Sequence, residues 1–565
     1  MYDLRPVKAP KLRGLSLRLV TVLLESALVR PFLMPSVLKS VGVSKFRKTQ
    51  TQTEPTNFPV VNPSGVEVSS VSPNEIAEAV AARSSEAMSV QFSLASITDY
   101  TRAYQEKRVS PEEVAERIIS AIDESNNIEP PLRAVIKSEA EDIRRQALES
   151  SKFLSEGRPR SILEGVPVSI KDDLDMPPYT THVGTRFLGD EDVAEDATIV
   201  AKLRAAGAIL VGKTNMFEIG ISPTGNNPIH GFARNPYHLD YDAGGSSGGS
   251  AASVGCGIVP LAIGADGGGS IRVPAAHCGV VGLKPTFGRV SAFGEAPLCP
   301  SVGHLGPIGA TAVDTAIGYA ICSGQDPKDP MSLGQPPMHL RDFHNLDLNG
   351  VTLGIYPQWF DDAAPEVAQR CRETLKVLEQ AGASVKEVSI ACLEETRVAH
   401  AITILTEMAT AMEPHYEKHR TDFGHATRIN LAMGRAFTSG DYMLAQRTRT
   451  EAMREWDRVF SEVDAVITPT TACTPPYLEP GTTRYGESDL SLLTEIMRFV
   501  VCGNLCGFPA ISFPAGYSEM GLPIGMQAIG RHWDEHLLLR LANVADHHVA
   551  RRKPTTFYSV LSGGC

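Results

Sequence analysis

The sequence lacks the patterns typical of metalloproteins and of nucleic-acid-binding proteins. Its ten cysteines are scattered, with no Cys-x-x-Cys pair and no zinc-type spacing of cysteine and histidine, so we expect no metal site. A formal net charge of −12 disfavours a general nucleic-acid binder, because such proteins carry strongly basic surfaces. Scattered cysteines are typical of an intracellular, reducing compartment, where most of them would be small buried side chains.

Acidic side chains are scarce in the first fifty residues. Ten Lys and Arg stand there against only Asp3 and Glu25, a net charge of +8, so the rest of the chain carries −20. The apolar run in this segment is interrupted by Arg18, Glu25 and Arg30, which makes it too short and too charged to span a bilayer. It also lacks the apolar core and cleavage site of a secretory signal, whereas an organellar transit peptide stays open.

Apolar residues recur at helical spacing within this basic segment. The apolar stripe comprises Leu15, Leu19, Val22 and Leu23, and Arg18, Thr21 and Glu25 lie on the other side. We expect residues 1–48 to form amphipathic helices, broken at Pro31 and Pro35, that dock on a membrane surface. The alternative is that these helices pack on the body of the protein itself.

Composition separates the first helices from the rest of the chain. Residues 49–75 are rich in Thr, Ser, Pro and Asn, and we expect residues 49–92 to be a linker and lead-in to a main domain over 93–560. A clear helix of that domain begins after Ser110. The sequence Ser-Pro-Glu-Glu at 110–113 supplies an N-cap, a proline in the first turn and a reciprocal glutamate.

From about residue 160 onward, short apolar runs alternate with helical stretches. One helical stretch, 364–381, ends before Gly382, a usual position for a C-terminal cap. The runs that predict strands are 166–170, 208–211, 351–356, 464–469 and 509–516. This alternation predicts an α/β fold in which helices cover both faces of a central sheet.

A match to the phosphate-binding loop pattern G-x-x-x-x-G-K-T occurs at residues 207–214. Such a loop must follow its strand and expose backbone amides. Residues 208–211 are themselves the apolar strand, and Gly207 ends the preceding helical stretch. We therefore interpret the match as a coincidence rather than a nucleotide site.

Three pieces of sequence carry chemistry together. Lys171 ends an apolar strand in GVPVSIKDDLD, Ser246 and Ser247 lie in GGSSGGSAA at 244–252, and Ser270 follows three glycines in GADGGGSIR at 264–272. A serine hydroxyl becomes a nucleophile when a neighbouring base takes its proton, and a buried lysine can be that base. Glycines leave backbone N–H groups free to bind an oxyanion. The sequence therefore predicts a serine hydrolase site.

These pieces resemble the amidase signature family. The matching motifs are G-x-P-x-x-x-K-D at 165–172, GGSSGGSAA and D-x-G-G-S-I-R-x-P-A at 266–275, with Ser246 and Ser270 separated by 24 positions. The resemblance extends over roughly 95–560. It implies a mixed, twisted central sheet with helices on both faces, preceded here by the N-terminal amphipathic helical extension.

The resemblance also implies a role for each matching residue. Ser270 would be the acyl-forming nucleophile, Ser246 would relay its proton, and Lys171 would be the neutral base that starts the relay. The other implied residues are Gly245, joined to Ser246 by a cis peptide bond, the oxyanion-binding N–H groups of Gly267, Gly268, Gly269 and Ser270, and the supporting Ser247, Asp266 and Arg272. This chemistry needs no metal or organic cofactor, and we expect no catalytic histidine, His277 included.

Within the family, the chain is similar to the plant-type fatty acid amide hydrolases. The segments that carry this likeness are 8–26, 233–236, 468–476 and 497–512. It implies hydrolysis of N-acylethanolamines to a fatty acid and ethanolamine, with Gly220 and Thr224 near the amide group of the substrate. It also implies a homodimer, attached peripherally or monotopically to the endoplasmic reticulum or plasma membrane, that binds no nucleic acid.

Three alternatives stay open at this point. One is a general amidase that acts on small amides, and another is the amidase subunit of a glutamyl-tRNA amidotransferase. The third is a membrane scaffold that keeps the fold without the activity. The long basic N-terminal segment disfavours the amidotransferase, and intact Lys171, Ser246 and Ser270 disfavour the scaffold.

Overall fold

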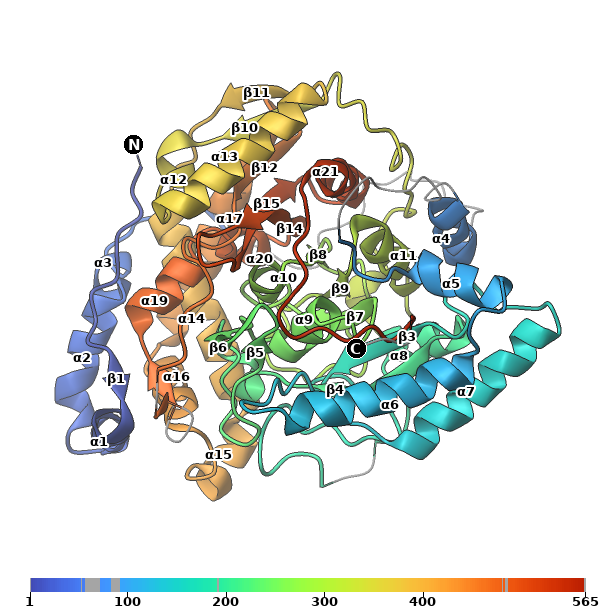
Figure 1. Cartoon of the computed structure of the whole chain (residues 1–565). Coiled ribbons are helices and arrows are strands. Elements are labelled where there is room, and N and C mark those ends of the chain that lie inside the picture. The colour runs from blue at the N-terminus through green and yellow to red at the C-terminus, as the bar shows by residue number, and fades with distance from the viewer. Residues whose placement is uncertain are drawn as a thin grey trace.

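A single mixed sheet carries most of the strands. The computed structural model describes residues 2–51, 53–55, 72–82, 92–190, 193–479, 481–482 and 486–562, and within them this sheet has eleven strands (Figure 1). Their order is β11 (Ser384–Glu387), β10 (Thr352–Ile355), β12 (Ala465–Pro469), β15 (Pro523–Gly530), β14 (Ala510–Tyr517), β8 (Val281–Lys284), β9 (Leu305–Gly309), β7 (Leu261–Ala265), β3 (Pro167–Lys171), β4 (Ile209–Thr214) and β2 (Val135–Lys137).

The five apolar runs expected to be strands all lie in this sheet, as β3, β4, β10, β12 and β14. Parallel pairs occur toward the two ends, where β7, β3 and β4 form one set and β12, β10 and β11 the other. The middle strands from β7 through β9, β8, β14 and β15 to β12 pair antiparallel. Lys171 therefore ends a strand that is paired on both sides and buried along its whole length.

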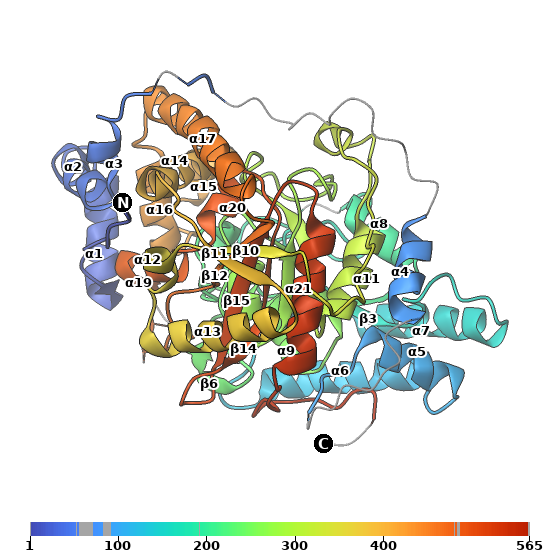
Figure 2. The same ribbon diagram turned by 90° about the horizontal axis from the view of Figure 1, so that it is seen from above.

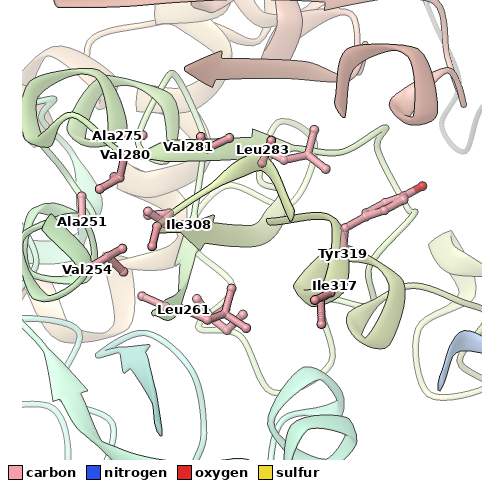
Figure 3. Close-up of a cluster of buried hydrophobic side chains, with 14 of the residues drawn as sticks. Ala251, Val254, Leu261, Ala275, Val280, Val281, Leu283, Ile308, Ile317 and Tyr319 are labelled. Carbon is pink, nitrogen blue, oxygen red and sulfur yellow. The ribbon is translucent and has the colours of Figure 1, made fainter. Parts of the chain in front are cut away.

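Helices cover both faces of the sheet, as predicted. On one face lie α9 (Gly248–Gly255) and α10 (Arg272–Cys278), and on the other lie α11 (Ala312–Cys322), α13 (Pro365–Gln380) and α21 (Glu535–His548). Figure 3 shows side chains from α9, α10 and α11 meeting those of β7, β8 and β9 in the main core. Burial of these apolar side chains is the main favourable contribution to folding.

The remaining helices surround this core. Ser110 caps α6 and exchanges hydrogen bonds with Glu113, as its sequence predicted, and α13 ends before Gly382, which has a positive φ. The bounds are α4 (Pro73–Ala82), α5 (Ile97–Gln105), α6 (Pro111–Asn127), α7 (Ala140–Ser155), α8 (Thr198–Ala205), α12 (Pro357–Phe360), α14 (Leu393–Ala411), α15 (Glu413–His419), α16 (His425–Gly434), α17 (Ser439–Phe460), α19 (Leu490–Ile496) and α20 (Val501–Leu505).

The match to a phosphate-binding loop is a strand and not a loop. Residues 209–214 form β4, and Gly207 follows the end of α8 with a positive φ of 90°. The Lys213 side chain is buried, and its amine donates to the carbonyl oxygen of Leu174. No nest of backbone amides can form within a paired strand, so the interpretation of the match as a coincidence is confirmed.

The N-terminal segment contains three helices, α1 (Gly14–Glu25), α2 (Arg30–Ser40) and α3 (Val43–Phe46). Figures 1 and 2 show them beside α14, α16 and α19. β1 (Leu12–Arg13) pairs with β13 (Glu487–Ser488), and the Glu25 carboxylate binds the Arg428 guanidinium. The segment is therefore joined to the body by backbone pairing and by a largely buried ion pair.

The orientation of α1 agrees with the expected stripe, and one detail of α2 differs from expectation. Leu15, Leu19 and Val22 of the stripe are exposed, and Thr21, expected on the opposite side, is buried against the body. α1 packs on the body through Leu17, Thr21 and Leu24, and Glu25 at its end pairs with Arg428. Pro35 lies inside α2 instead of breaking it, since a proline removes only one backbone hydrogen bond and the Met34 and Leu38 side chains are buried around it.

The expected linker falls mostly outside the described residues, which omit 52, 56–71 and 83–91. Between those gaps, α4 packs against α11 on the outside of the helical layer. None of the helices in the described residues is both long and apolar enough to cross a membrane.

The central core yields a stability prediction. Ile308 lies on β9, is fully buried and belongs to the cluster in Figure 3. Replacing it with alanine removes buried apolar volume, so we expect Ile308→Ala to lower the free energy of unfolding by about 2–5 kcal/mol. Urea unfolding and the thermal midpoint measure the change. Leu148→Ala, at an exposed position on α7, is the control and should change stability little.

Candidate active site

Lys171 and Ser246, which lie far apart in sequence, are in direct contact. Lys171 Nζ donates to Ser246 Oγ at 2.9 Å and to the carbonyl oxygen of Ala265 at 3.2 Å. Both side chains are almost fully buried. The peptide bond between Gly245 and Ser246 is cis, as the resemblance implied. The end of β3 therefore presents an amine to a serine hydroxyl away from bulk water.

The loop that carries Ser270 is organised around one carboxylate. The Asp266 side chain accepts hydrogen bonds from the backbone N–H of Gly269 at 2.6 Å and of Ile271 at 3.1 Å. It also binds the Arg272 guanidinium, with 3.0 Å between Oδ2 and Nε. Burial opposes its charge, but the Arg272 guanidinium holds the pKa of Asp266 well below its usual range. Asp266 thus stays ionised and fixes the backbone on both sides of Ser270.

The Arg272 side chain connects this loop to the C-terminal part of the chain. Its guanidinium donates to Gln527 Oε1 at 2.7 Å, to Asn504 Oδ1 at 2.6 Å and to the carbonyl oxygen of Val500 at 3.0 Å. Arg272 is fully buried, and every one of these partners is an oxygen. A buried guanidinium needs such partners, because an unpaired buried charge is costly.

The three glycines before Ser270 lie where side chains do not fit. A Cβ at Gly267 would lie 2.9 Å from Cys299 Sγ, and one at Gly268 would lie 2.8 Å from His400 Cε1. Gly269 has a φ of 113°, a conformation that side chains disfavour. Close packing and backbone conformation therefore both require glycine here.

One expected oxyanion donor is already engaged. The N–H of Gly269 donates to Asp266, so its direction is set by that carboxylate and not by the cavity. Over the described part of the chain, the N–H groups of Gly267, Gly268 and Ser270 donate no hydrogen bond. The structure thus reduces the set of candidate oxyanion donors to these three groups.

Ser247 has a supporting position, as expected from its motif. Its hydroxyl donates to the carbonyl oxygen of Ala265 at 3.1 Å, and its backbone N–H donates to the carbonyl oxygen of Ser270 at 3.2 Å. These two bonds join the loop before α9 to the end of β7 and to the loop before α10. The two glycine-rich loops are therefore held in register.

A largely apolar cavity opens above Ser270. It holds about 1070 Å³ of space outside protein atoms, including its open mouth. Its lining includes Gly268 and Ser270 from the glycine loop and apolar side chains from α14, α16 and α19. Val7, Val41 and Val43 of the N-terminal segment also line it, from the chain before β1, the residue after α2 and the start of α3. Figure 1 shows this segment beside α14, α16 and α19.

The two residues expected near the substrate amide have different positions. Gly220, which ends a short 3-10 turn (Glu218–Gly220), lines the cavity, and a Cβ there would lie 3.3 Å from Ser246 Oγ. Thr224 does not line this cavity. Its backbone carbonyl instead lies so close to Gly245 that a side chain at Gly245 would overlap it. Thr224 is thus packed against Gly245, where only glycine fits.

His400 on α14 is a part of the site that the sequence reasoning missed. Its Nε2 lies 2.8 Å from the carbonyl oxygen of Gly267, and it also lines the cavity. Burial lowers the pKa of His400 to about 4, so the ring is neutral near pH 7 and donates one N–H to that carbonyl. The sequence contains little indication of this contact, because His400 lies 133 positions from Gly267 and its helix, α14, carries no recognisable motif.

The comparisons with known proteins agree with this geometry. The amidase family profile matches residues 113–539. A fatty acid amide hydrolase of Medicago truncatula is 38% identical over 99% of this chain and 96% of its own length. A glutamyl-tRNA(Gln) amidotransferase chain of Alkaliphilus metalliredigens is 34% identical over 79% of this chain and 94% of its own. A solved bacterial aryl acylamidase of the amidase signature family superimposes with a TM-score of 0.73 at 27% identity, over 84% of this chain and 99% of its own.

The chain therefore belongs to the amidase signature family and has its fold. It is an amide hydrolase, and among its relatives are the plant fatty acid amide hydrolases as well as amidotransferase chains.

His277, which follows the loop of Ser270 on α10, yields a prediction for stability against pH. In the described structure neither ring nitrogen of His277 has a hydrogen-bond partner, and burial lowers its pKa to about 3. The unfolded chain binds a proton here below about pH 6.5, whereas the folded chain does not until about pH 3. Stability is therefore lost as the pH falls through this window.

We expect His277→Leu to reduce this loss, so that the drop in thermal midpoint between pH 8 and pH 5 is smaller than in the parent protein. Part of the drop remains, because burial also lowers the pKa of His400 and of His532 to about 4. The exposed His548→Leu is the matched control. If the thermal midpoint of His277→Leu falls between pH 8 and pH 5 as much as that of the parent protein, His277 is not a source of the loss of stability.

Proposed function

We propose that the chain hydrolyses N-acylethanolamines to a free fatty acid and ethanolamine, with Ser270 as nucleophile, Ser246 as proton relay and Lys171 as base. The observation that carries the proposal is the buried 2.9 Å hydrogen bond between Lys171 and Ser246 beneath an apolar cavity that reaches Ser270. The likeness to fatty acid amide hydrolases over almost the whole chain supports the substrate class.

In the proposed reaction, the neutral Lys171 amine takes the proton of Ser246 Oγ, which in turn takes the proton of Ser270 Oγ. Ser270 Oγ then forms a bond to the substrate carbonyl carbon, and the N–H groups of Gly267, Gly268 and Ser270 hold the resulting oxyanion. The same relay, run in reverse, returns one proton to the amine nitrogen as the C–N bond breaks. Water then repeats the sequence on the acyl-enzyme and releases the fatty acid.

The composition of the cavity wall supports an acyl chain as its occupant. Ile404, Leu405, Met408, Leu493 and Met497 are among the apolar side chains that line it together with Ser270. An apolar chain gains free energy in proportion to the area that it buries, whereas a small polar amide would leave such a wall unfilled. This favours a long-chain amide over a small one.

The N-terminal helices support uptake of the substrate from a membrane, which we also propose. Five large apolar side chains on or between α1 and α2 are exposed: Leu15, Leu19, Val22, Leu28 and Phe32. The first fifty residues carry a net charge of +8, which attracts anionic lipid headgroups. The same segment contributes Val7, Val41 and Val43 to the cavity wall, so a docked surface would lie next to the cavity.

The reaction is tested with a purified protein, a long-chain N-acylethanolamine and a short aryl amide. We expect release of the fatty acid and a loss of kcat of about 10³-fold or more in Ser270→Ala, because the nucleophile is removed. A fluorophosphonate should label the parent protein and leave Ser270→Ala unlabelled. The exposed Ser16→Ala, at the start of α1, is the matched control and should keep its activity.

Hydrolysis of the aryl amide without the lipid amide would overturn the lipid assignment and leave a general amidase. Full activity in Ser270→Ala would overturn the assignment of the nucleophile. Activity that requires added partner chains and an ammonia donor would indicate part of an amidotransferase instead.

Membrane docking predicts a separate effect of the exposed apolar side chains. We expect the double variant Leu28→Ser, Phe32→Ser to bind anionic phospholipid vesicles at least about tenfold more weakly, because each removed side chain would bury an apolar group in the lipid. These side chains are 84% and 82% exposed, so folding should not suffer. Sedimentation with vesicles measures binding.

The control is Leu148→Ser, Met520→Ser, which removes exposed apolar side chains elsewhere on the surface. Hydrolysis of a soluble short aryl amide should be the same in all three proteins. Equal vesicle binding by both double variants would contradict docking through α1 and α2.

A further inference from the structure

A carboxylate that no step above uses lies against the Lys171 amine. The distance between Lys171 Nζ and Asp173 Oδ2 is 3.0 Å, and both side chains are buried. β3 ends at Lys171, and the chain then turns so that the second residue after it points back to the amine. Asp173 Oδ1 has no hydrogen-bond partner in the described part of the chain. Lys171 is thus the charged partner that this carboxylate contacts.

The adjacent Asp172 belongs to a different pair. Its carboxylate lies 3.8 Å from the Lys213 amine and accepts from the backbone N–H of Gly184 at 3.1 Å. Two lysines and two aspartates therefore sort into separate pairs at the ends of β3 and β4. Only the Asp173 pair includes the amine that contacts Ser246.

The other groups around Lys171 do not replace Asp173 as the source of negative charge. Ser246 Oγ and the Ala265 carbonyl oxygen are neutral contacts. Burial and the neighbouring Asp173 carboxylate raise the pKa of Glu295, which favours its uncharged form. Burial raises the pKa of the Cys299 thiol well above its usual range, so it is neutral too.

An ionised carboxylate so close to the amine has two opposing effects. It fixes the amine in place, since Lys171 has a long, flexible side chain with several rotamers. It also favours the protonated amine, because an opposite charge at this distance stabilises the charged form. A base must be unprotonated to act, so the same contact that positions Lys171 also limits the pH at which it works.

We propose that Asp173 is the positioning residue for the general base: its carboxylate holds the Lys171 amine against Ser246 and sets the pH above which that amine can take a proton. This rests on the proposed role of Lys171. The Lys171 amine held in this way takes the proton of Ser246 Oγ, and Ser246 Oγ takes that of Ser270 Oγ.

The test is the pH profile of kcat/KM for the short aryl amide, whose acid limb reports the base of the free enzyme. Asp173→Asn removes the charge and keeps the volume, so we expect its acid limb to move to lower pH by about one unit or more. At the plateau we expect kcat/KM to fall about tenfold, because the amide of asparagine holds the amine less firmly. Asp173→Glu keeps the charge, so the acid limb of its pH profile stays in place, while its plateau value of kcat/KM falls.

Asp175→Asn is the matched control. It removes a carboxylate two positions away that contacts Thr181 Oγ1 instead of Lys171, so its limb should not move. An acid limb in Asp173→Asn that is unmoved, or that moves to higher pH, overturns the proposal. Circular dichroism and the thermal midpoint show whether Asp173→Asn folds. If it does not, Asp173→Glu is used instead. An acid limb of kcat/KM that is shifted in Asp173→Glu, with the plateau value unchanged, overturns the proposal.

Ser270→Ala and Lys171→Ala separate this proposal from the proposed function. Loss of activity in both, with an unmoved limb in Asp173→Asn, overturns only the role of Asp173. Retained activity in either one overturns the relay itself, whatever the Asp173 variants do.

Discussion

The buried ion pair between Asp266 and Arg272 is the interaction on which the site depends. Its carboxylate binds backbone N–H groups on both sides of Ser270, and its guanidinium binds oxygen atoms of Val500, Asn504 and Gln527. Segments separated by more than two hundred residues thus meet at one pair of charges. Removing either partner would leave a buried charge unpaired, which typically destabilises a protein by about 3–5 kcal/mol.

The site lies where two kinds of structure meet. Lys171 ends a strand toward one end of the sheet, whereas Ser246 and Ser270 precede the helices α9 and α10 on one face. The strand is rigid because it is paired on both sides, and the loops are held by Ser247 and Asp266. Side chains supported in this way are held in a fixed geometry, as a preorganised site needs.

Some residues that line the cavity lie in the part of the chain common to the family, and others lie in the N-terminal segment outside it. The aryl acylamidase and the amidotransferase chain match about four fifths of this protein, whereas the Medicago truncatula fatty acid amide hydrolase matches almost all of it. The family profile begins at residue 113, after the N-terminal helices. Val7, Val41 and Val43, which line one side of the cavity, therefore lie outside the segment that defines the family.

Local sequence determined where several strands and helix ends of this protein lie. The strands β3, β4, β10, β12 and β14, the Ser110 cap and the end of α13 at Gly382 follow from apolar runs and capping residues, which act over a few positions. The motifs identified Lys171 and Ser246, which the fold brings into contact, and the glycines before Ser270, where close packing and a positive φ favour glycine.

Only the tertiary structure decided which groups face one another. His400 contacts Gly267 across 133 positions, the Gly269 N–H donates to Asp266, and Thr224 packs against Gly245 without lining the cavity. It also decided which face of α1 meets the body, because Leu17, Thr21 and Leu24 are buried there and leave Leu15 and Leu19 exposed. Periodicity gives the positions that share a helix face, but the partner that a face meets depends on long-range packing and charge pairing, which no local pattern contains.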